Sequence, residues 1–417
     1  MSESQQTKHS IDDQEDSFSS KEAPLESKTE TESHIDTSKL EEDPANKAAS
    51  LKILRVASDV YPDVMGGLSL HVHEMSRLQA EWGHDVTVLT SDHGDRNLPS
   101  KEERSGYELI RHREIASPLD NTIIPGIVQT IRRMADDYDV IHAHSHLFFS
   151  TNATAALSRT LDTPLVITNH GLISQTAPRW LQKAFIPTVA KFTLNAADEV
   201  LCYTETDKCR LRERGIDSSI SIINNGIDCD RFSPEQSDES KKQILFVGRL
   251  KPGKGVQTLL TAFEQLTADF PEYSLKIVGN GPLLDDLVEM AHECNISTHI
   301  EFAGQIENNE IGEVYAESEV FVLPSLNEGV PRTVLEAMAC EVPVVTSDLD
   351  QLIPIVNNAG FTVPSESPDK FQAAIKKLLN DAELQNEMGR VGRSRVKNHY
   401  SWNNTVSETL GIYKSLL

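Results

Sequence analysis

The sequence predicts an α/β protein made of two Rossmann-like, doubly wound domains, preceded by a disordered acidic tail. Its 417 residues, 38% of them hydrophobic, are too many for one small core and fit two domains plus a tail. From Leu51 onward, short apolar runs rich in β-branched residues alternate with helical patterns, which is typical of a parallel sheet covered by helices. A polar segment at residues 234–242 interrupts this alternation once, and the alternation then starts again.

Residues 1–49 form the predicted tail. They are rich in Ser, Glu, Asp, Thr and Lys and show neither a helical nor a strand period. Because such a segment cannot bury enough apolar surface to fold, we expect it to be disordered.

The first domain is predicted over residues 50–233. A strand at residues 51–57 leads into a loop with Gly66 and Gly67, and a helical pattern follows. Further strands are expected at residues 86–90, 140–141, 165–168, 199–202 and 221–223.

The second domain is predicted over residues 241–399, and residues 400–417 have the apolar spacing of an amphipathic helix. Its strands are expected at residues 244–248, 275–279, 300–304, 320–323 and 343–346. Open parallel sheets bind ligands at the carboxyl ends of their strands, so two such edges facing each other predict a site in a central cleft.

The loop after the strand at residues 244–248 carries the strongest chemical signal. It places Arg249 and Lys254 on a glycine-bearing turn before a helix. An Arg fork and a compact Lys charge suit a diphosphate, and glycine lets the backbone come close to it. The alternative is a solvated basic turn.

A second loop, after the strand at residues 320–323, leads into a helix near Pro331. Free backbone N–H groups at Val330–Thr333 and the helix dipole predict a phosphate site that needs no metal. Glu328 in the loop and Glu336 one turn into the helix are placed to accept hydrogen bonds from sugar hydroxyls. The alternative is a capping carboxylate and an exposed helical one.

Together these segments resemble family 4 of the retaining glycosyltransferases, whose GT-B fold has two Rossmann-like domains facing a central cleft. The resemblance covers residues 51–417. It rests on Gly66-Gly67 with the helix after it, the loop with Arg249 and Lys254, Val278-Gly279-Asn280-Gly281-Pro282, and Glu328 separated by seven residues from Glu336.

The resemblance implies a role for each matching position. Arg249 and Lys254 are expected to bind the donor diphosphate, Glu336 the ribose and Glu328 the transferred hexose. The donor site is completed by Gly66, Gly67, Gly329, Val330 and Pro331. His170 is expected to position the sugar and to support the transition state, with capping of backbone groups as the alternative. The helix at residues 400–417 is expected to cross back to the first domain.

Two segments depart from the family pattern. Relatives tend to have a glycine pair and an acidic residue where this chain has Asp348-Leu349-Asp350-Gln351, and glycine where it has Glu341. We expect the first loop to close differently around the donor.

His142, His144 and His146 alternate, so a strand would project all three to one side, as a metal site requires. No carboxylate or cysteine completes a ligand set. We therefore expect no metal and assign the three to the lining of the cleft.

Charge and cysteine content limit the partners and the location. A net charge of -25 excludes a nucleic-acid partner, and it suits either general solubility or a high-salt cytoplasm. Five scattered cysteines, and the lack of a signal peptide or an apolar span, favour the cytoplasm. The apolar and basic segment at residues 178–186 predicts a helix that Pro187 limits, either resting on the inner face of a membrane or packed in the protein.

The predicted reaction is transfer of a hexose from a UDP- or GDP-sugar to a hydroxyl of a glycan or lipid-linked acceptor, with no cofactor. The alternatives are a nucleotide-sugar epimerase of similar fold and a non-catalytic nucleotide-sugar-binding protein. A dinucleotide oxidoreductase is disfavoured because the first loop lacks the G-x-G-x-x-G turn.

Overall fold

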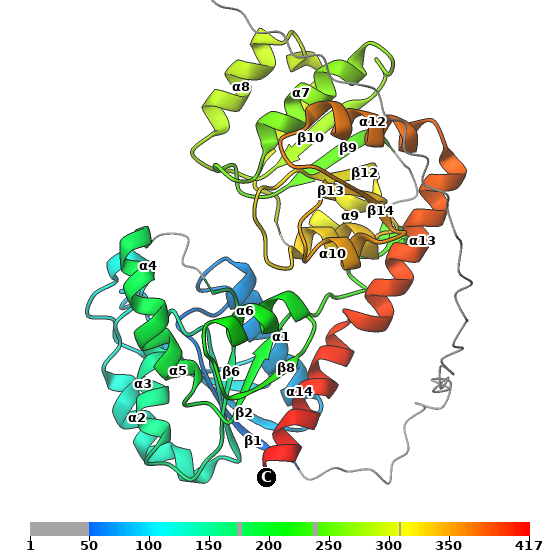
Figure 1. Cartoon of the computed structure of the whole chain (residues 1–417). Coiled ribbons are helices and arrows are strands. Elements are labelled where there is room, and N and C mark those ends of the chain that lie inside the picture. Colours follow the sequence, from blue (N-terminus) through cyan, green and yellow to red (C-terminus); the bar gives the residue numbers. More distant parts are fainter. Residues whose placement is uncertain (1–49, 173–176, 237–240, 308–309) are drawn as a thin grey trace, which may run out of the picture. The chain divides into compact units, whose positions relative to one another are not determined.

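The computed structural model describes residues 50–172, 177–236, 241–307 and 310–417. The predicted tail, residues 1–49, lies outside the described residues. The described chain contains two sheets with helices around each (Figure 1). The predicted class, α/β with two doubly wound domains, is confirmed.

The first domain contains an eight-stranded sheet in the order β3-β4-β2-β1-β5-β6-β7-β8. All neighbours are parallel except β3 and β4, which are antiparallel. The strands are β1 (Lys52–Val56), β2 (Asp85–Ser91), β3 (Lys101–Arg104), β4 (Tyr107–His112), β5 (Val140–His144), β6 (Leu165–Thr168), β7 (Glu199–Cys202) and β8 (Ser219–Ile222).

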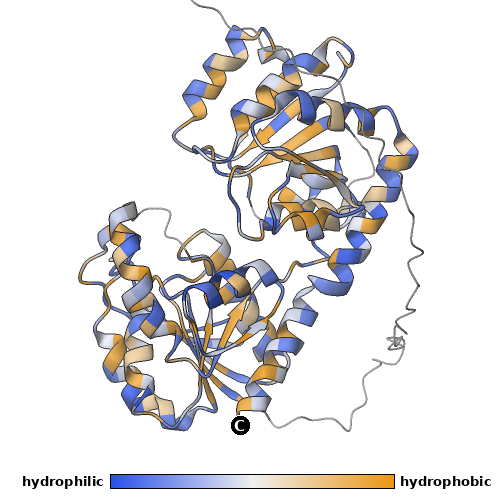
Figure 2. Cartoon of the chain, viewed as in Figure 1, coloured by the Kyte–Doolittle hydropathy of each residue, from blue (hydrophilic) through white to orange (hydrophobic). Residues whose placement is uncertain are grey.

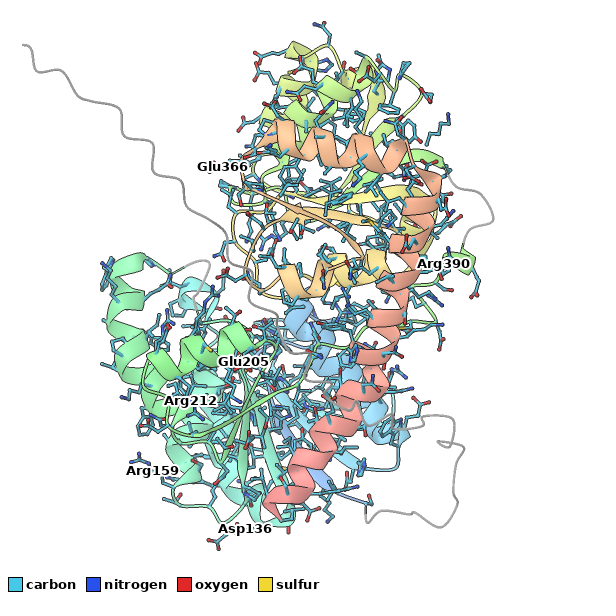
Figure 3. The ribbon with its side chains drawn as sticks, turned by 45° about the vertical axis from the view of Figure 1, so that its right-hand side comes forward. Asp136, Arg159, Glu205, Arg212, Glu366 and Arg390 are labelled. Atoms are coloured by element: carbon cyan, nitrogen blue, oxygen red, sulfur yellow. The ribbon has the colours of Figure 1, made fainter. Side chains whose placement is uncertain are left out.

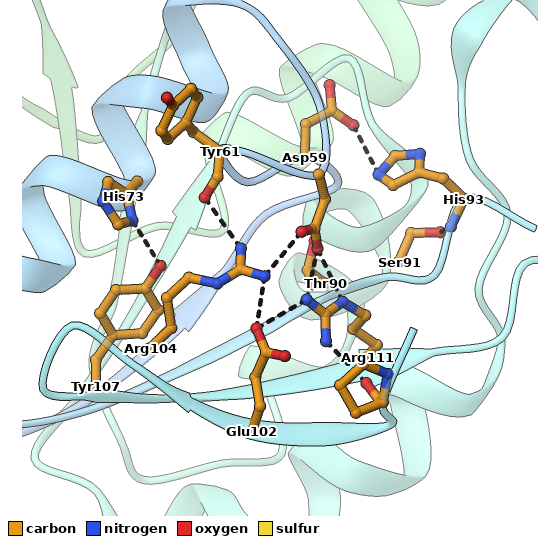
Figure 4. Close-up of polar contacts among 12 residues, drawn as sticks. Asp59, Tyr61, His73, Thr90, Ser91, His93, Glu102, Arg104, Tyr107 and Arg111 are labelled. Carbon is orange, nitrogen blue, oxygen red and sulfur yellow. Dashed lines mark hydrogen bonds and ion pairs between the residues drawn. The ribbon is translucent and has the colours of Figure 1, made fainter. Parts of the chain in front are cut away.

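The β3–β4 hairpin is absent from the sequence-based prediction. Its turn residues Ser105 and Gly106 both have positive φ angles, which suits a two-residue hairpin loop. β3 is an edge strand of four charged residues, Lys-Glu-Glu-Arg, so it lacks the apolar alternation by which strands are recognised. Ion pairs of Arg104 and Arg111 with Glu102 tie the hairpin together (Figure 4).

Helices cover both faces of this sheet. On one face, α1 (Gly67–Glu81) and α14 (Trp402–Leu416) share a hydrophobic core with β1 and β2. The other face is covered by α2 (Gly126–Met134), α3 (Phe149–Ser158), α5 (Lys191–Leu194) and α6 (Glu205–Glu213). The C-terminal helix therefore packs on the first domain, through Trp402, Val406, Leu410 and Tyr413.

The helical segment around Pro187 is longer than expected. α4 (Arg179–Phe185) continues through a π-helical turn (Ile186–Ala190) into α5. The expectation that Pro187 limits this helix is wrong, because proline occupies the second position of a wide turn, where its ring and missing N–H are accommodated.

The second domain contains a six-stranded, fully parallel sheet in the order β11-β10-β9-β12-β13-β14. Its strands are β9 (Lys241–Val247), β10 (Ser274–Val278), β11 (Ile300–Gly304), β12 (Ser318–Leu323), β13 (Val344–Ser347) and β14 (Gly360–Val363). Only β14 is missing from the prediction. It is a half-buried edge strand whose Gly360 lies against the backbone of Val344.

Seven helices of the second domain lie within the described residues. They are α7 (Val256–Thr267), α8 (Leu284–Glu293), α9 (Ile311–Ala316), α10 (Arg332–Ala339), α11 (Ile353–Val356), α12 (Pro368–Leu379) and α13 (Ala382–His399). One hydrophobic core joins them to the sheet. Apolar residues concentrate along the strands of both domains (Figure 2).

Along the chain, β8 is the last strand of the first sheet and β9 is the first strand of the second sheet. The segment between Ile222 and Lys241 therefore joins the two domains. The predicted limits, residues 50–233 and 241–399, stay a prediction. None of the described helices has the length and apolar character required to cross a lipid bilayer.

Candidate active site

Three loops of the second domain converge because the strands before them are neighbours. β10, β9 and β12 lie side by side in the sheet, and the loops at residues 248–255, 279–282 and 324–331 follow their carboxyl ends. The strand order reverses between β9 and β12, which is where open α/β sheets bind ligands. All three loops come from motifs that the sequence singled out.

Glycines let the three loops touch backbone to backbone. A Cβ on Gly279 would lie 1.9 Å from the carbonyl oxygen of Gly248, and one on Gly255 would lie 2.0 Å from that of Pro324. Direct hydrogen bonds join the same loops, from Leu326 N–H to the Gly253 carbonyl at 2.8 Å and from Leu250 N–H to the Asn280 carbonyl at 2.9 Å. The edge is therefore one rigid unit that larger residues would push apart.

Lys254 and Glu328 meet at this edge. The Lys254 Nζ and Glu328 Oε1 atoms are 2.5 Å apart, and only 18% and 11% of the two side chains are exposed. Arg249 lies in the same loop and is exposed. Burial and the nearby charges of Lys254 and Arg249 lower the pKa of Lys251, so this loop concentrates positive charge. Such a loop attracts a phosphate group.

α10 begins at the same edge with its first-turn N–H groups uncapped by any side chain. Pro331 is the residue before the helix, and Gly329 and Val330 lie in the loop that leads into it. An uncapped N-terminus carries partial positive charge and attracts anions. Because α10 follows the carboxyl end of β12, its N-terminus lies at the same sheet edge as the basic loop at residues 248–255.

Glu336 lies one turn inside α10 and is held by two neighbours. Its Oε2 atom accepts a hydrogen bond from the Tyr315 hydroxyl at 3.0 Å, and its Oε1 atom is 3.6 Å from Nε of Arg332. Burial and this carboxylate raise the pKa of Tyr315 well above its usual value, so the phenol stays a donor. Each carboxylate oxygen keeps a second lone pair that can accept from a hydroxyl.

The loop that departs from the family pattern contacts Glu328. The buried Gln351 amide donates a hydrogen bond to the backbone carbonyl of Glu328. Glu341, the other departure, adopts φ 60°, a left-handed conformation that favours the glycine expected in relatives. The loop with Gln351 therefore contributes to the site, whereas Glu341 only shapes a turn after α10.

The remaining predicted donor residues, Gly66 and Gly67, lie in the first domain. Gly66 precedes α1 in an extended conformation, and Gly67 is the first residue of that helix, whose N-terminus has no side-chain cap. This start of α1 follows β1 and lies near the carboxyl edge of the first sheet.

His170 belongs to a cluster of rings at that edge. Its Nδ1 atom is 2.8 Å from the Tyr203 hydroxyl and its Nε2 atom is 3.0 Å from Nδ1 of His144. His71 of α1 packs edge-on against His170, with ring centroids 5.2 Å apart. Both ring nitrogens of His170 thus bind side chains, so the alternative that it caps backbone groups is wrong.

Burial keeps these histidines uncharged. It lowers the pKa of His71 to about 3 and those of His142, His144 and His170 well below 6.5. At neutral pH His170 therefore acts as a hydrogen-bonding imidazole and not as a cation.

His142, His144 and His146 do not form the expected row. β5 ends at His144, and Ser145 adopts φ 64°, which breaks the alternation before His146. All three are fully buried, so their assignment to the cleft lining is wrong. Among the described residues, the histidines with mutually close ring nitrogens are His71, His144 and His170, within 4.8 Å of one another.

The sequence did not single out Lys251, Tyr315, Arg332, Gln351, His71 or Tyr203 as site residues. Lys251 and Arg332 lie inside motifs that were identified, so counting every cation there would have found them. Gln351 lies in the loop that departs from the family pattern, so that departure could have pointed to it. Tyr315 comes from α9, and no local pattern marks it.

Two family models match the chain, one in each half. Residues 65–231 match the model described as "Glycosyltransferase Family 4", and residues 230–395 match "Glycosyl transferases group 1". Their matches meet between β8 and β9, where the two sheets are joined.

Similar proteins are found among characterised enzymes and solved structures. Glycogen synthase of Mycobacterium tuberculosis is 26% identical over 394 residues, which span 87% of this chain and 94% of that enzyme. The GDP-mannose-dependent alpha-(1-6)-phosphatidylinositol monomannoside mannosyltransferase of the same species is 25% identical, over 84% and 95%. The structure of Anabaena HepE with UDP and glucose superposes with a TM-score of 0.71 at 17% identity, over 88% of this chain and all of that one.

Proposed function

The chain belongs to family 4 of the glycosyltransferases, with a group 1 domain in its second half, and on that premise we propose which reaction it catalyses. The reaction is metal-independent transfer of a hexose from a nucleoside diphosphate to an acceptor hydroxyl, with retention of configuration. The observation that carries the proposal is the convergence of a basic loop, two carboxylates and an uncapped helix N-terminus at one rigid sheet edge.

The leaving group sets the main chemical demand. As the bond between the anomeric carbon and the phosphate oxygen breaks, negative charge develops on the departing diphosphate. Lys254 and the N-terminus of α10 lie at one sheet edge, and Arg249 lies in the same loop as Lys254. We propose that these groups neutralise the charge in place of a metal ion. The acceptor hydroxyl attacks the anomeric carbon, and its proton passes to the leaving phosphate oxygen.

The carboxylates orient the donor. Lys254 holds the Glu328 carboxylate and Gln351 holds its backbone carbonyl, and the remaining carboxylate lone pairs are proposed to accept hydrogen bonds from the hexose hydroxyls. Glu336, fixed by Tyr315, is proposed to accept hydrogen bonds from the ribose hydroxyls. His170 is proposed to position the sugar from the first domain, which requires one ring nitrogen to exchange its present partner for a sugar hydroxyl.

The relatives do not select one donor or one acceptor. HepE was solved with UDP and glucose, whereas the mycobacterial mannosyltransferase depends on GDP-mannose. Glycogen synthase acts on a glycan, whereas the mannosyltransferase modifies phosphatidylinositol monomannoside. We propose a UDP- or GDP-sugar as donor and a glycan or a lipid-linked sugar as acceptor. The five cysteines are free thiols, which suits the cytoplasm as the proposed location.

The test is nucleotide release from a panel of UDP-, GDP- and ADP-sugars, with and without EDTA. One donor should be consumed, and EDTA should leave the rate unchanged. Lys254→Ala should lower the rate about a hundredfold, since one preorganised cation contributes about 3 kcal/mol to transition-state stability. Lys370→Ala, which removes an exposed lysine of α12, is the matched control and should act like the wild type.

Three results would contradict the proposal in whole or in part. Conversion of the donor sugar to its epimer without any acceptor would indicate an epimerase. Tight nucleotide-sugar binding without turnover, with every acceptor class supplied, would indicate a binding protein. Loss of activity in EDTA that Mg²⁺ restores would refute metal independence while leaving the transfer reaction in place.

A further inference from the structure

One part of the first domain has a charge opposite to the rest of the chain. The protein contains 64 acidic and 39 basic residues, yet between residues 140 and 197 the only acidic residue is Asp162. The same stretch contains four cations, namely Arg159, Arg179, Lys183 and Lys191. It includes α3 and α5, which pack on one face of the sheet, and α4, which continues through the π-helical turn into α5.

Large apolar side chains are exposed on the same helices. Trp180 of α4 is 71% exposed, although tryptophan is rarely left in water. Val189 and Phe192, in the continuous helical segment that follows, are also exposed. One continuous helical segment thus exposes three large apolar side chains within thirteen positions.

Cations accompany these apolar groups. Lys183 is exposed one turn after Trp180 on α4. The Arg159 guanidinium of α3 lies 4.8 Å from the centre of the Phe192 ring, and Figure 3 shows Arg159 projecting from the outer surface. Neither Arg159 nor Lys183 forms an ion pair with any described residue. We call Arg159, Trp180, Lys183, Val189 and Phe192 the apolar-basic patch.

We propose that the apolar-basic patch docks the protein on a bilayer that contains anionic lipid. A tryptophan between lysine and arginine matches the membrane interface, where the indole lies among the headgroups and the cations meet lipid phosphates. Charge favours this occupant over the same patch of a second copy, because two basic patches facing each other repel, whereas lipid phosphates attract the patch.

The charge distribution also fixes the orientation of docking. An anionic surface repels the acidic remainder of the chain and attracts the patch, so the face formed by α3, α4 and α5 turns toward the lipid. The second domain then supplies the donor chemistry, while the first domain lies against the membrane. Docking itself is independent of the proposed glycosyl transfer and is measured without any nucleotide sugar.

The experiment is vesicle flotation of the full chain, using phosphatidylcholine vesicles with and without phosphatidylglycerol. We expect binding only when phosphatidylglycerol is present, and weaker binding as NaCl rises, since the screening length falls from about 10 Å at 0.1 M to about 3 Å at 1 M. Lys183→Glu should lower affinity about 25-fold, because it changes the charge by two units near an anionic surface. Trp180→Ala should lower it by at least about tenfold through lost burial.

Matched variants on other faces serve as controls. Trp82→Ala removes a tryptophan that is 43% exposed at the end of α1, and Lys370→Glu reverses an exposed lysine of α12. Both should float like the wild type. No flotation of the wild type with phosphatidylglycerol would overturn the proposal, and so would equal flotation of all variants. A dimer that Trp180→Ala converts to monomers, without vesicle binding, would show that a second copy covers the patch.

Discussion

Replacing Gly279 by alanine should destabilise the second domain by about 3 kcal/mol. Gly279 has φ +136°, which non-glycine residues adopt at a cost of about 1–3 kcal/mol. Its new Cβ would also lie 1.9 Å from the carbonyl oxygen of Gly248, so the loops after β9 and β10 must separate by more than 1 Å. Overpacking of this kind costs about 1–3 kcal/mol, and the stiffer unfolded chain returns less than 1 kcal/mol.

Three other glycines of the same loops separate the two causes. Gly281→Ala creates a contact of 2.2 Å with the Leu250 carbonyl at an ordinary φ, so only overpacking acts. Gly253→Ala has φ +92° and no atom within 4 Å, so only backbone strain acts. Gly329→Ala has neither problem and should be neutral or slightly stabilising. The expected order of destabilisation is Gly279, then Gly281 and Gly253, then Gly329.

Scanning calorimetry measures the transition of the second domain. A domain of this size loses about 2–4 °C in Tm per kcal/mol, so Gly279→Ala should lower Tm by about 6–12 °C. Activity should fall as well, because shifting the basic loop by about 1 Å costs on the order of a hundredfold in rate. If Gly279→Ala melted within about 2 °C of Gly329→Ala, the loops would not be the rigid unit described above.

Two further predictions concern the first domain. Burial lowers the folded-state pKa of His71 to about 3, and it also lowers the pKa values of His142, His144 and His170. Below about pH 6.5 the unfolded chain therefore binds more protons than the folded protein. The histidines should therefore leave the folding stability unchanged above about pH 6.5. Below that pH the stability should fall, by up to about 1.4 kcal/mol per pH unit for each histidine. A calorimetric Tm that stays constant from about pH 7.5 to about pH 5 would contradict this prediction. Tyr413→Phe removes a hydroxyl that contacts His142 and lies 3.4 Å from the buried Arg55 guanidinium. The free energy of unfolding of the first domain should therefore fall by about 2 kcal/mol. An unchanged Tm would show that Arg55 does not need this hydroxyl.

The fold could largely be predicted because its inner strands are apolar runs between glycine loops. β9, for example, is the run Ile244–Val247 followed by Gly248, and both the strand and the phosphate loop after it follow from that pattern. The missed strands, β3, β4 and β14, lie at or next to sheet edges, where half of the backbone faces water and polar residues are tolerated. The error at Pro187 has a different origin, since only the backbone shows that a wide turn accommodates the ring.

The candidate site was predicted in its parts but not in its connections. Lys254 and Glu328 were each assigned to the donor, yet their contact joins residues 74 positions apart, and the sequence does not indicate it. His170 was identified, whereas its partners His144, Tyr203 and His71 come from three other elements. The alternation of His142, His144 and His146 predicted that all three side chains project to one side of a strand. That prediction is wrong because Ser145 turns the chain before His146.

The sequence by itself determined the order of the inner strands and the helices between them, the loops that end those strands, and the residue types that suit a nucleotide sugar. These are local properties, since side-chain period and glycine position act over a few residues. The tertiary structure alone decided that β10, β9 and β12 are neighbours, that Gly279 lies against Gly248, and that the uncharged histidines form one cluster. The alternation of apolar residues predicts which side of a strand is buried, but which element covers that side depends on how the whole sheet assembles.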